Sequence, residues 1–299
     1  MGGSRMTSFE GVYPPVTTPF RGDEVAYDKL GENLDRLGAY PLAGYVVLGS
    51  TGEFVLLSES EKERVLATAR EHTPRPRLMI AGTGGEATGA AIRLTKRAVD
   101  LGADAAVVIT PSYYKAMMKP AALIRHYRAV ADASPIPIML YNFPANTGIN
   151  LDADTVARLA EHPNIRGIKD SSGNVPQAAE TIRVTPKAFE VLIGSPLAFL
   201  PCLTIGAGGG ILGIANLAPR ECCEIWRLAR AGQFAEAREI VSRISPLATG
   251  IAARYGIGGL KAALDLLGFY GGPPRLPLPM PDADAVEDTK EILATAGLL

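Results

Sequence analysis

One lysine within an expected β-strand is the residue of this chain best suited to covalent chemistry. Lys169 is the only one of the nine lysines that falls inside an expected strand, in the run Asn-Ile-Arg-Gly-Ile-Lys-Asp at 164–170. The apolar residues that alternate before it indicate a buried side chain. Burial disfavours the charged form of an amine, so the pKa of a lysine in an apolar site falls from about 10.4 toward neutrality and a nucleophilic amine becomes available. Such amines form Schiff bases with carbonyl substrates. The position alone also fits a lysine that ends a strand and extends its ammonium to water.

The elements around Lys169 predict its place in the fold. Short apolar runs alternate with amphipathic stretches, which is typical of βα units around a parallel sheet. The expected strands span 11–17, 45–48, 77–83, 105–110, 136–142, 165–170, 190–195 and 209–214. The expected helices span 27–37, 58–71, 86–101, 120–133, 152–161, 175–184, 197–205 and 219–231.

Eight strand–helix units match an α/β fold of the (β/α)₈ TIM barrel type, whose typical size is about 250 residues. We therefore expect a catalytic barrel at residues 9–231. The remaining residues, 232–299, indicate an appended C-terminal helical domain with helices that include 257–267 and 283–296. A Gly/Pro-rich stretch at 271–274 separates these two helices.

The barrel predicts where the active site lies, because active sites in this fold lie at the carboxyl ends of the strands. Polar residues follow four of the expected strands: Gly-Ser-Thr-Gly-Glu at 49–53, Thr-Pro-Ser-Tyr-Tyr at 110–114, Tyr141-Asn142, and Lys169-Asp170-Ser171. Each set alone would be ordinary loop chemistry. Four sets on one face, two of them rich in hydroxyl groups and one carrying the strand lysine, favour a Schiff-base enzyme.

Composition excludes several other classes of protein. A net charge of −1, 47% hydrophobic and 20% charged residues and a mean hydropathy of +0.13 are typical of a globular enzyme and argue against nucleic acid or an anionic membrane as partner. Three cysteines, two of them adjacent, form no disulfide framework. The three histidines show no metal-binding spacing, so no protein-bound metal is expected. Residues 1–8 lack the apolar core of a secretory signal, and no apolar run reaches about 18 residues, so we expect a cytoplasmic protein.

Taken together, the motifs resemble a known family over essentially the whole chain: the pyruvate-dependent class I aldolases and synthases related to dihydrodipicolinate synthase and N-acetylneuraminate lyase. The resemblance rests on Gly-Ser-Thr-Gly-Glu at 49–53, Tyr-Asn-Phe-Pro at 141–144, Gly-Ile-Lys-Asp-Ser-Ser-Gly at 167–173 and the glycine-rich stretch from 206 to 216. Any one of these motifs would be weak, whereas the set is highly specific.

The resemblance implies roles for particular residues. Lys169 would form an imine with the C2 carbonyl of pyruvate or another 2-oxo acid and act as an electron sink, without a cofactor. Tyr141 would shuttle protons. Thr51 would link tyrosines in a proton relay that includes a tyrosine from across a subunit interface, Tyr113 by position, with Tyr114 as the alternative. The family also suggests a homotetramer built as a dimer of dimers. The substrate-binding residues would be Ser50, Gly52, Asn146, Ser171 and Ile211.

One departure from the sequence of dihydrodipicolinate synthase narrows the range of possible substrates. After the Tyr-Asn-x-Pro motif that enzyme has an arginine for the carboxylate of its second substrate, whereas this chain has Asn146, which offers no charged fork. This region, together with residues 11–20, 255–261 and 268–273, looks most like 4-hydroxy-2-oxoglutarate aldolase, which releases pyruvate and glyoxylate. Thr51 stands where we expect asparagine in the animal-type aldolase, so dihydrodipicolinate synthase and an aldolase for 2-keto-3-deoxy sugar acids stay open.

Two interpretations come from other classes of protein. The run Gly-Thr-Gly-Gly-Glu-Ala at 82–87 satisfies the dinucleotide fingerprint and would suggest a dehydrogenase, although two βα units precede it. A barrel that kept its fold and lost its chemistry would be a binding protein. The presence of Lys169, Tyr141 and Thr51 together argues against that second interpretation.

Overall fold

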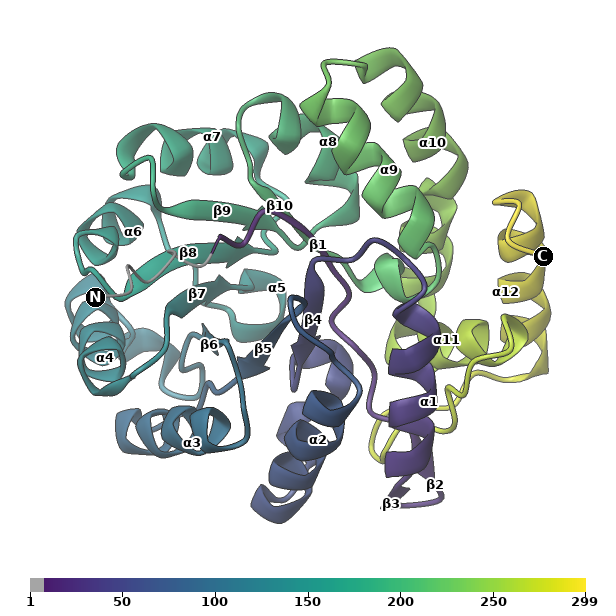
Figure 1. Ribbon diagram of the computed structural model, residues 1–299, viewed down its shortest axis with the longest axis horizontal. Coiled ribbons are helices and arrows are strands. Elements are labelled where there is room, and N and C mark those ends of the chain that lie inside the picture. The colour runs from purple at the N-terminus through teal and green to yellow at the C-terminus, as the bar shows by residue number, and fades with distance from the viewer. Residues whose placement is uncertain (1–7) are drawn as a thin grey trace.

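The computed structural model describes residues 8–299 and shows a ring of eight parallel strands surrounded by helices (Figure 1). Residues 1–7, on which the expected absence of a secretory signal rests in part, lie outside the described residues. The strands of the ring are β1 (Gly11–Tyr13), β4 (Gly44–Val47), β5 (Leu78–Gly82), β6 (Ala105–Ile109), β7 (Ile138–Asn142), β8 (Ile165–Asp170), β9 (Glu190–Ile193) and β10 (Gly209–Ile211). The expected TIM barrel is confirmed.

The two edge strands of the sheet, β1 and β4, complete the ring through few contacts. Pro15 forms an isolated parallel bridge with Val46, whose backbone N–H donates to the carbonyl of Pro14 at 3.1 Å. Pro14 and Pro15 have no N–H to offer to a ladder, which explains why β1 ends at Tyr13 and not at residue 17 as predicted.

A helix follows each strand of the ring and covers its outer side. These helices are α1 (Tyr27–Leu37), α2 (Glu59–Glu71), α3 (Thr88–Asp100), α4 (Pro120–Ala133), α6 (Ala153–Ala160), α7 (Val175–Val184), α8 (Pro196–Thr204) and α9 (Pro219–Arg230). One large apolar cluster lies between them and the sheet, and a second one, which includes Tyr141 and Ile211, fills the inside of the ring. The expected helices are therefore present, with ends that differ by a few residues.

The chain ends in further helices on one side of the barrel (Figure 1). They are α10 (Phe234–Pro246), the π-helical turn η5 (Leu247–Ala252), α11 (Ala253–Leu266) and α12 (Ala283–Thr295). Helix α10 packs on α8 and α9, and α12 packs on α11. The C-terminal helices are thus present, whereas the division of the chain at residue 231 stays a prediction.

Several short elements were not predicted, because they are too brief to show a hydrophobic period. They are the antiparallel hairpin of β2 (Phe20–Arg21) and β3 (Glu24–Val25), the short helix α5 (Pro144–Thr147), and the 3₁₀ turns η1 (Ser50–Gly52), η2 (Phe54–Leu56), η3 (Lys115–Met117) and η4 (Gly213–Asn216). Five of them, α5 and the four turns, follow strands of the barrel, where the chain leaves the sheet.

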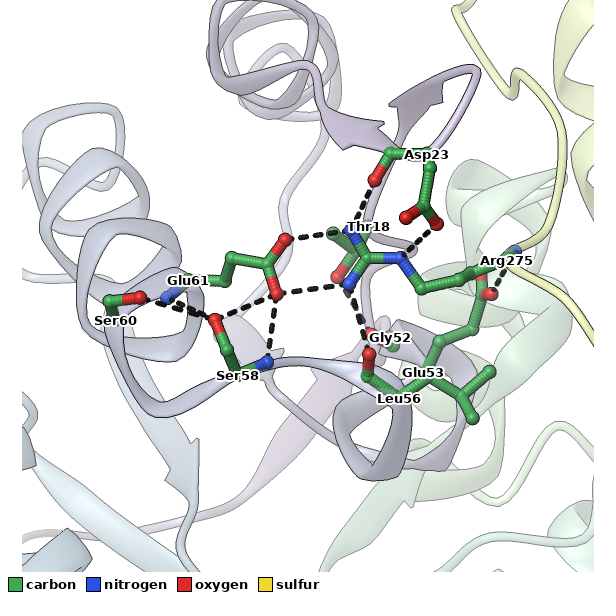
Figure 2. A network of polar contacts seen from close by, with 9 residues as sticks. All are labelled: Thr18, Asp23, Gly52, Glu53, Leu56, Ser58, Ser60, Glu61 and Arg275. Atoms are coloured by element: carbon green, nitrogen blue, oxygen red, sulfur yellow. Dashed lines mark hydrogen bonds and ion pairs between the residues drawn. The ribbon is translucent and has the colours of Figure 1, made fainter.

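The segment between α11 and α12 is tied to the start of α2 (Figure 2). Ser58 and Glu61 form a capping box at the first turn of α2, and the Glu61 carboxylate also accepts two hydrogen bonds from Arg275 at 2.7 and 2.9 Å. The Arg275 guanidinium, assisted by Ser58, lowers the pKa of Glu61 from 4.5 to about 2.

This pKa shift predicts an acid-dependent contribution to stability. Because the pKa of Glu61 is lower in the folded chain than in the unfolded one, the contribution is complete above pH 4.5 and is lost as the pH falls toward 2. Glu61→Gln keeps the capping box but removes the charge, and we expect it to lower the free energy of unfolding by about 1 kcal/mol at pH 7, since the pair is partly solvated.

Urea unfolding of both proteins between pH 7 and pH 2 measures this contribution. The difference in unfolding free energy should shrink as the pH falls below 4.5 and vanish near pH 2. A difference that stays constant over this range would show that the Glu61 charge is not stabilised by Arg275.

Candidate active site

Lys169 lies inside the barrel because of its register with the two neighbouring strands. It pairs with Tyr141 on β7 and with Leu192 on β9, and both of these residues belong to the apolar cluster inside the ring. Paired residues of parallel strands point to the same face of a sheet. The Lys169 side chain is 4% exposed, and its Nζ lies 4.1 Å from the centroid of the Tyr141 ring. A lysine that extends its ammonium to water is therefore excluded.

The next residue pair along β7 and β8 points outward and fixes these strand ends. Asn142 Nδ2 donates to Asp170 Oδ1 at 3.1 Å, while Asn142 Oδ1 accepts the backbone N–H of Leu151 at 2.9 Å. Asp170 Oδ1 also accepts the backbone N–H of Ser172 at 2.9 Å. The chain segments on either side of Lys169 and Tyr141 are thus held by buried, paired polar groups.

Gly194 leaves space for the lysine and for Ser171, and sequence reasoning missed it. A Cβ atom at residue 194 would lie 1.9 Å from Ser171 Oγ and 3.2 Å from Lys169 Cε. Ser171 itself is held by its backbone N–H, which donates to the carbonyl of Asn142 at 2.8 Å. In the sequence Gly194 falls within the strand expected at 190–195, and no pattern there marks it as a neighbour of Lys169.

A cavity of about 840 Å³ opens at the carboxyl ends of the strands. Its walls include three of the predicted residues, Ser50, Thr51 and Asn146. Thr110, from the polar set at 110–114 but without a predicted role of its own, also lines it, and the buried Thr110 hydroxyl has no hydrogen-bond partner among residues 8–299. Ile257, Leu260 and Leu278, from the C-terminal region, complete part of the wall.

The remaining predicted residues lie deeper or elsewhere. Gly52 is buried, and its carbonyl accepts a hydrogen bond from the Thr18 hydroxyl at 2.7 Å. Ile211 ends β10 and lies in the apolar cluster inside the ring together with Tyr141. The structure therefore brings Lys169, Tyr141 and Ile211 together inside the barrel, with Ser171 beside Lys169. It places Ser50, Thr51 and Asn146 on the cavity wall.

Tyr113 does not join this group within one chain. It is 78% exposed and forms an edge-to-face contact with Tyr114, which is 69% exposed. The Glu86 carboxylate holds the loop before it, because it accepts the backbone N–H groups of Ser112 and Tyr113 at about 3 Å. Burial alone would raise the pKa of Glu86, but these hydrogen bonds outweigh it, so its pKa lies below the usual value.

The contacts of Glu86 also argue against a dinucleotide-binding site at residues 82–87. The run at 82–87 follows β5, the third strand of a barrel, and not the first strand of a doubly wound sheet. Glu86 within it binds the 112–113 loop, and a Cβ at Gly84 would lie 2.8 Å from the backbone nitrogen of Ile109. The two features show that this motif serves packing between β5 and β6.

The described part of the chain offers neither a metal site nor a membrane-spanning helix. Residues 8–299 contain no group of three or more His, Cys, Asp or Glu side chains that could hold a metal ion. No helix in this described part of the chain is long and apolar enough to cross a membrane.

Comparison with known proteins gives a consistent result. Residues 8–296 match the model of the dihydrodipicolinate synthetase family. The 4-hydroxy-tetrahydrodipicolinate synthase of Methanospirillum hungatei is 38% identical over 96% of this chain and 99% of the relative. The enzyme of the same name from Methanothrix thermoacetophila is 40% identical over 92% of each chain.

Solved structures agree with the sequence matches. The chloride-inhibited dihydrodipicolinate synthase from Acinetobacter baumannii, solved in complex with pyruvate, is 33% identical and superposes with a TM-score of 0.94 over 98% of this chain and all of that one. The dihydrodipicolinate synthase of Thermotoga maritima, 29% identical over 97% of this chain and 99% of that one, also has a TM-score of 0.94. The expectation of a carbon–carbon lyase is confirmed at the level of the family: the chain belongs to the dihydrodipicolinate synthetase family.

Proposed function

We propose that Lys169 of this enzyme attacks the C2 carbonyl of a 2-oxo acid and forms an imine. The observation that carries the proposal is the buried amine of Lys169, whose Nζ lies 4.1 Å from the centroid of the Tyr141 ring inside the barrel. A buried lysine with an aromatic hydroxyl residue as its strand neighbour has both the nucleophile and a proton donor for imine formation. The reaction needs no cofactor beyond this covalent bond.

The preferred substrate is 4-hydroxy-2-oxoglutarate. Lys169 Nζ bonds to C2 and the carbonyl oxygen leaves as water. The C4 hydroxyl then loses its proton and the C3–C4 bond breaks, so that glyoxylate leaves and the electron pair enters the iminium to give an enamine. Protonation at C3 and hydrolysis of the imine release pyruvate and restore the lysine. Tyr141, relayed through Thr51 and the partner tyrosine, would move these protons.

Asn146 favours this substrate over that of the synthase. It lies in the cavity wall on the short helix α5, at the position where dihydrodipicolinate synthase is expected to have an arginine. A neutral amide cannot replace the two parallel, charge-assisted hydrogen bonds of an arginine with a carboxylate. The chain therefore lacks, at this position, the group that would hold the second substrate of the synthase.

The names of the relatives favour the second candidate, 4-hydroxy-tetrahydrodipicolinate synthase. Removing the three carbons of pyruvate from the seven-carbon product leaves a four-carbon amino aldehyde with its own carboxylate, aspartate 4-semialdehyde. Thr51 supplies the hydroxyl expected in the synthase branch. A 2-keto-3-deoxy sugar acid is a further substrate of the same chemical class.

We also propose that the enzyme works as an assembly of subunits, a homotetramer built from dimers. The exposure of Tyr113 and Tyr114 supports this proposal, because two adjacent exposed aromatic rings are typical of an interface. In the assembly, Tyr113 or Tyr114 would reach the cavity of the neighbouring subunit. A cytoplasmic location stays a prediction.

Borohydride reduction in the presence of pyruvate tests the imine directly, because it converts the imine to a stable secondary amine. We expect peptide mass spectrometry to find the reduced pyruvate adduct on Lys169. Lys169→Ala should lose both the adduct and turnover, whereas Lys187→Ala, which changes an exposed lysine, should keep both. A folded wild-type enzyme without an adduct would contradict the proposal.

Gly194→Ala should slow imine formation, because the new methyl group must displace Ser171 and crowd Lys169 Cε. A misplacement of the reacting group by about 1 Å can lower a rate by about a hundredfold, so we expect a loss of roughly ten- to a hundredfold in the rate of adduct formation. Gly89→Ala is the matched control, since its Cβ would meet only an arginine side chain at 3.6 Å. Equal rates for the two variants would show that Gly194 does not shape the lysine site.

The kcat/KM values of the enzyme for the two reactions, cleavage and condensation, decide between the two candidates. We expect wild-type kcat/KM for pyruvate release from 4-hydroxy-2-oxoglutarate to exceed that for condensation of pyruvate with aspartate 4-semialdehyde. Asn146→Arg should move the ratio toward condensation by about tenfold or more, since a charged hydrogen bond contributes about 1.5–3 kcal/mol. Wild-type condensation that exceeds cleavage would establish the synthase instead.

A further inference from the structure

Glu53 is a buried acid that follows the Ser50–Gly52 turn directly. Its backbone is in the left-handed region with φ 56°, a conformation that residues other than glycine rarely adopt. Its side chain is fully buried, and its two oxygens have different partners. Oε1 lies 2.5 Å from Lys261 Nζ. Oε2 accepts the backbone N–H of Arg275 at 2.8 Å (Figure 2).

Both partners of Glu53 come from the C-terminal part of the chain. Lys261, on α11, is fully buried and also donates to the carbonyl of Pro273 at 2.9 Å. Arg275 Nη1 donates to the carbonyl of Leu56 at 2.9 Å and binds Glu61. Lys261 Nζ lies 4.4 Å from the centroid of the Phe20 ring, and Arg275 Cζ lies 4.5 Å from the same centroid. The segment from 271 to 275 is therefore fastened to the chain that follows β4.

Stability alone gives a poor reason for this buried ion pair. Burying two charges carries a desolvation penalty that their attraction often only offsets, so apolar replacements are frequently neutral or stabilising. Removing one partner is different, because it leaves a buried charge without compensation. A pair of this kind can, however, fix one arrangement of the chain, since both groups must keep their partners.

The arrangement that it fixes is the cavity wall. The turn is held on one side by the Thr18 hydroxyl, which bonds the Gly52 carbonyl, and on the other by Glu53 and Leu56, which bond Lys261 and Arg275. Ser50 and Thr51, within this turn, line the cavity, as does Leu278, three residues after Arg275. The same contacts thus determine where the hydroxyl of Thr51 and the wall from the C-terminal segment lie.

We propose that Lys261 and Arg275 are positioning residues for catalysis: through Glu53 they hold the Ser50–Thr51 turn in the geometry that the reaction requires. The inference rests on the proposed function in one respect, that the Thr51 hydroxyl takes part in proton transfer. Lys261 itself is fully buried and does not line the cavity. The C-terminal helices are on this basis a part of the active site and not only a cover on the barrel.

Steady-state kinetics of Lys261→Met tests the proposal, with Lys290→Met, an exposed lysine of α12, as control. We expect kcat per folded enzyme to fall by about tenfold or more for Lys261→Met, as for a reacting group that is misplaced, and to stay unchanged for the control. In a Thr51→Val background the same substitution should lower kcat less than about threefold, because residues that act as one unit are not additive.

A second variant separates positioning from folding. Glu53→Gln combined with Lys261→Met removes both charges of the pair, so it should fold even where Lys261→Met alone does not. If this double variant folds and has wild-type kcat, the pair is structural only and the proposal is wrong. An equal loss of kcat with and without the Thr51 hydroxyl would also overturn it, because Lys261 would then act elsewhere.

Amide hydrogen exchange at residues 50–53 is a readout that does not depend on the chemistry. It should be about tenfold faster or more in the double variant than in the wild type, and unchanged exchange would contradict the positioning role. The proposed function fails separately, when the wild type forms no pyruvate adduct on Lys169. In that case the exchange result still decides whether the Glu53–Lys261 pair holds the turn.

Discussion

The register between β7 and β8 is the constraint on which the rest of the site depends. It puts Tyr141 beside Lys169 on the inner face and Asn142 beside Asp170 on the outer face. A slip by one residue would reverse both pairs, turning the lysine toward the helices and leaving a buried carboxylate inside the ring. The outward pair opposes such a slip, because Asn142 bonds Asp170 and the backbone of Leu151 at once. The Asn142–Asp170 pair on the outer face thus helps to keep Lys169 on the inner face.

A second requirement is that the cavity wall comes from distant parts of the chain. The β/α units deliver Ser50, Thr51, Thr110 and Asn146 to one end of the barrel, where loops are free to differ without disturbing the sheet. The C-terminal region adds Ile257, Leu260 and Leu278. Its link to the barrel at Glu53 and Glu61 is ionic and directional. Directional contacts therefore hold the chain directly after Ser50 and Thr51 and shortly before Leu278.

The sequence predicted what a local pattern can specify. Short apolar runs between amphipathic stretches predicted the eight strands, and the apolar residues before Lys169 correctly placed its amine in the interior. Contacts between distant residues left no such pattern. Lys261 lies in an ordinary amphipathic run, and only the folded chain brings it to Glu53. Gly194 and Glu86 were missed for the same reason, because a space beside Ser171 and a partner for the 112–113 loop exist only in three dimensions.

The barrel and its rim hold different parts of the site, which explains why similarity identifies the family but not the substrate. The proposed imine chemistry would depend on Lys169 and Tyr141, which the register fixes deep inside the ring. The choice of the second reacting group depends on rim residues such as Asn146, on a four-residue helix that the sheet does not constrain. One residue there changes the charge offered to a carboxylate without changing the fold. Overall similarity therefore reports the family and its barrel, whereas in the proposed reaction a few side chains on the rim would decide the aldehyde partner.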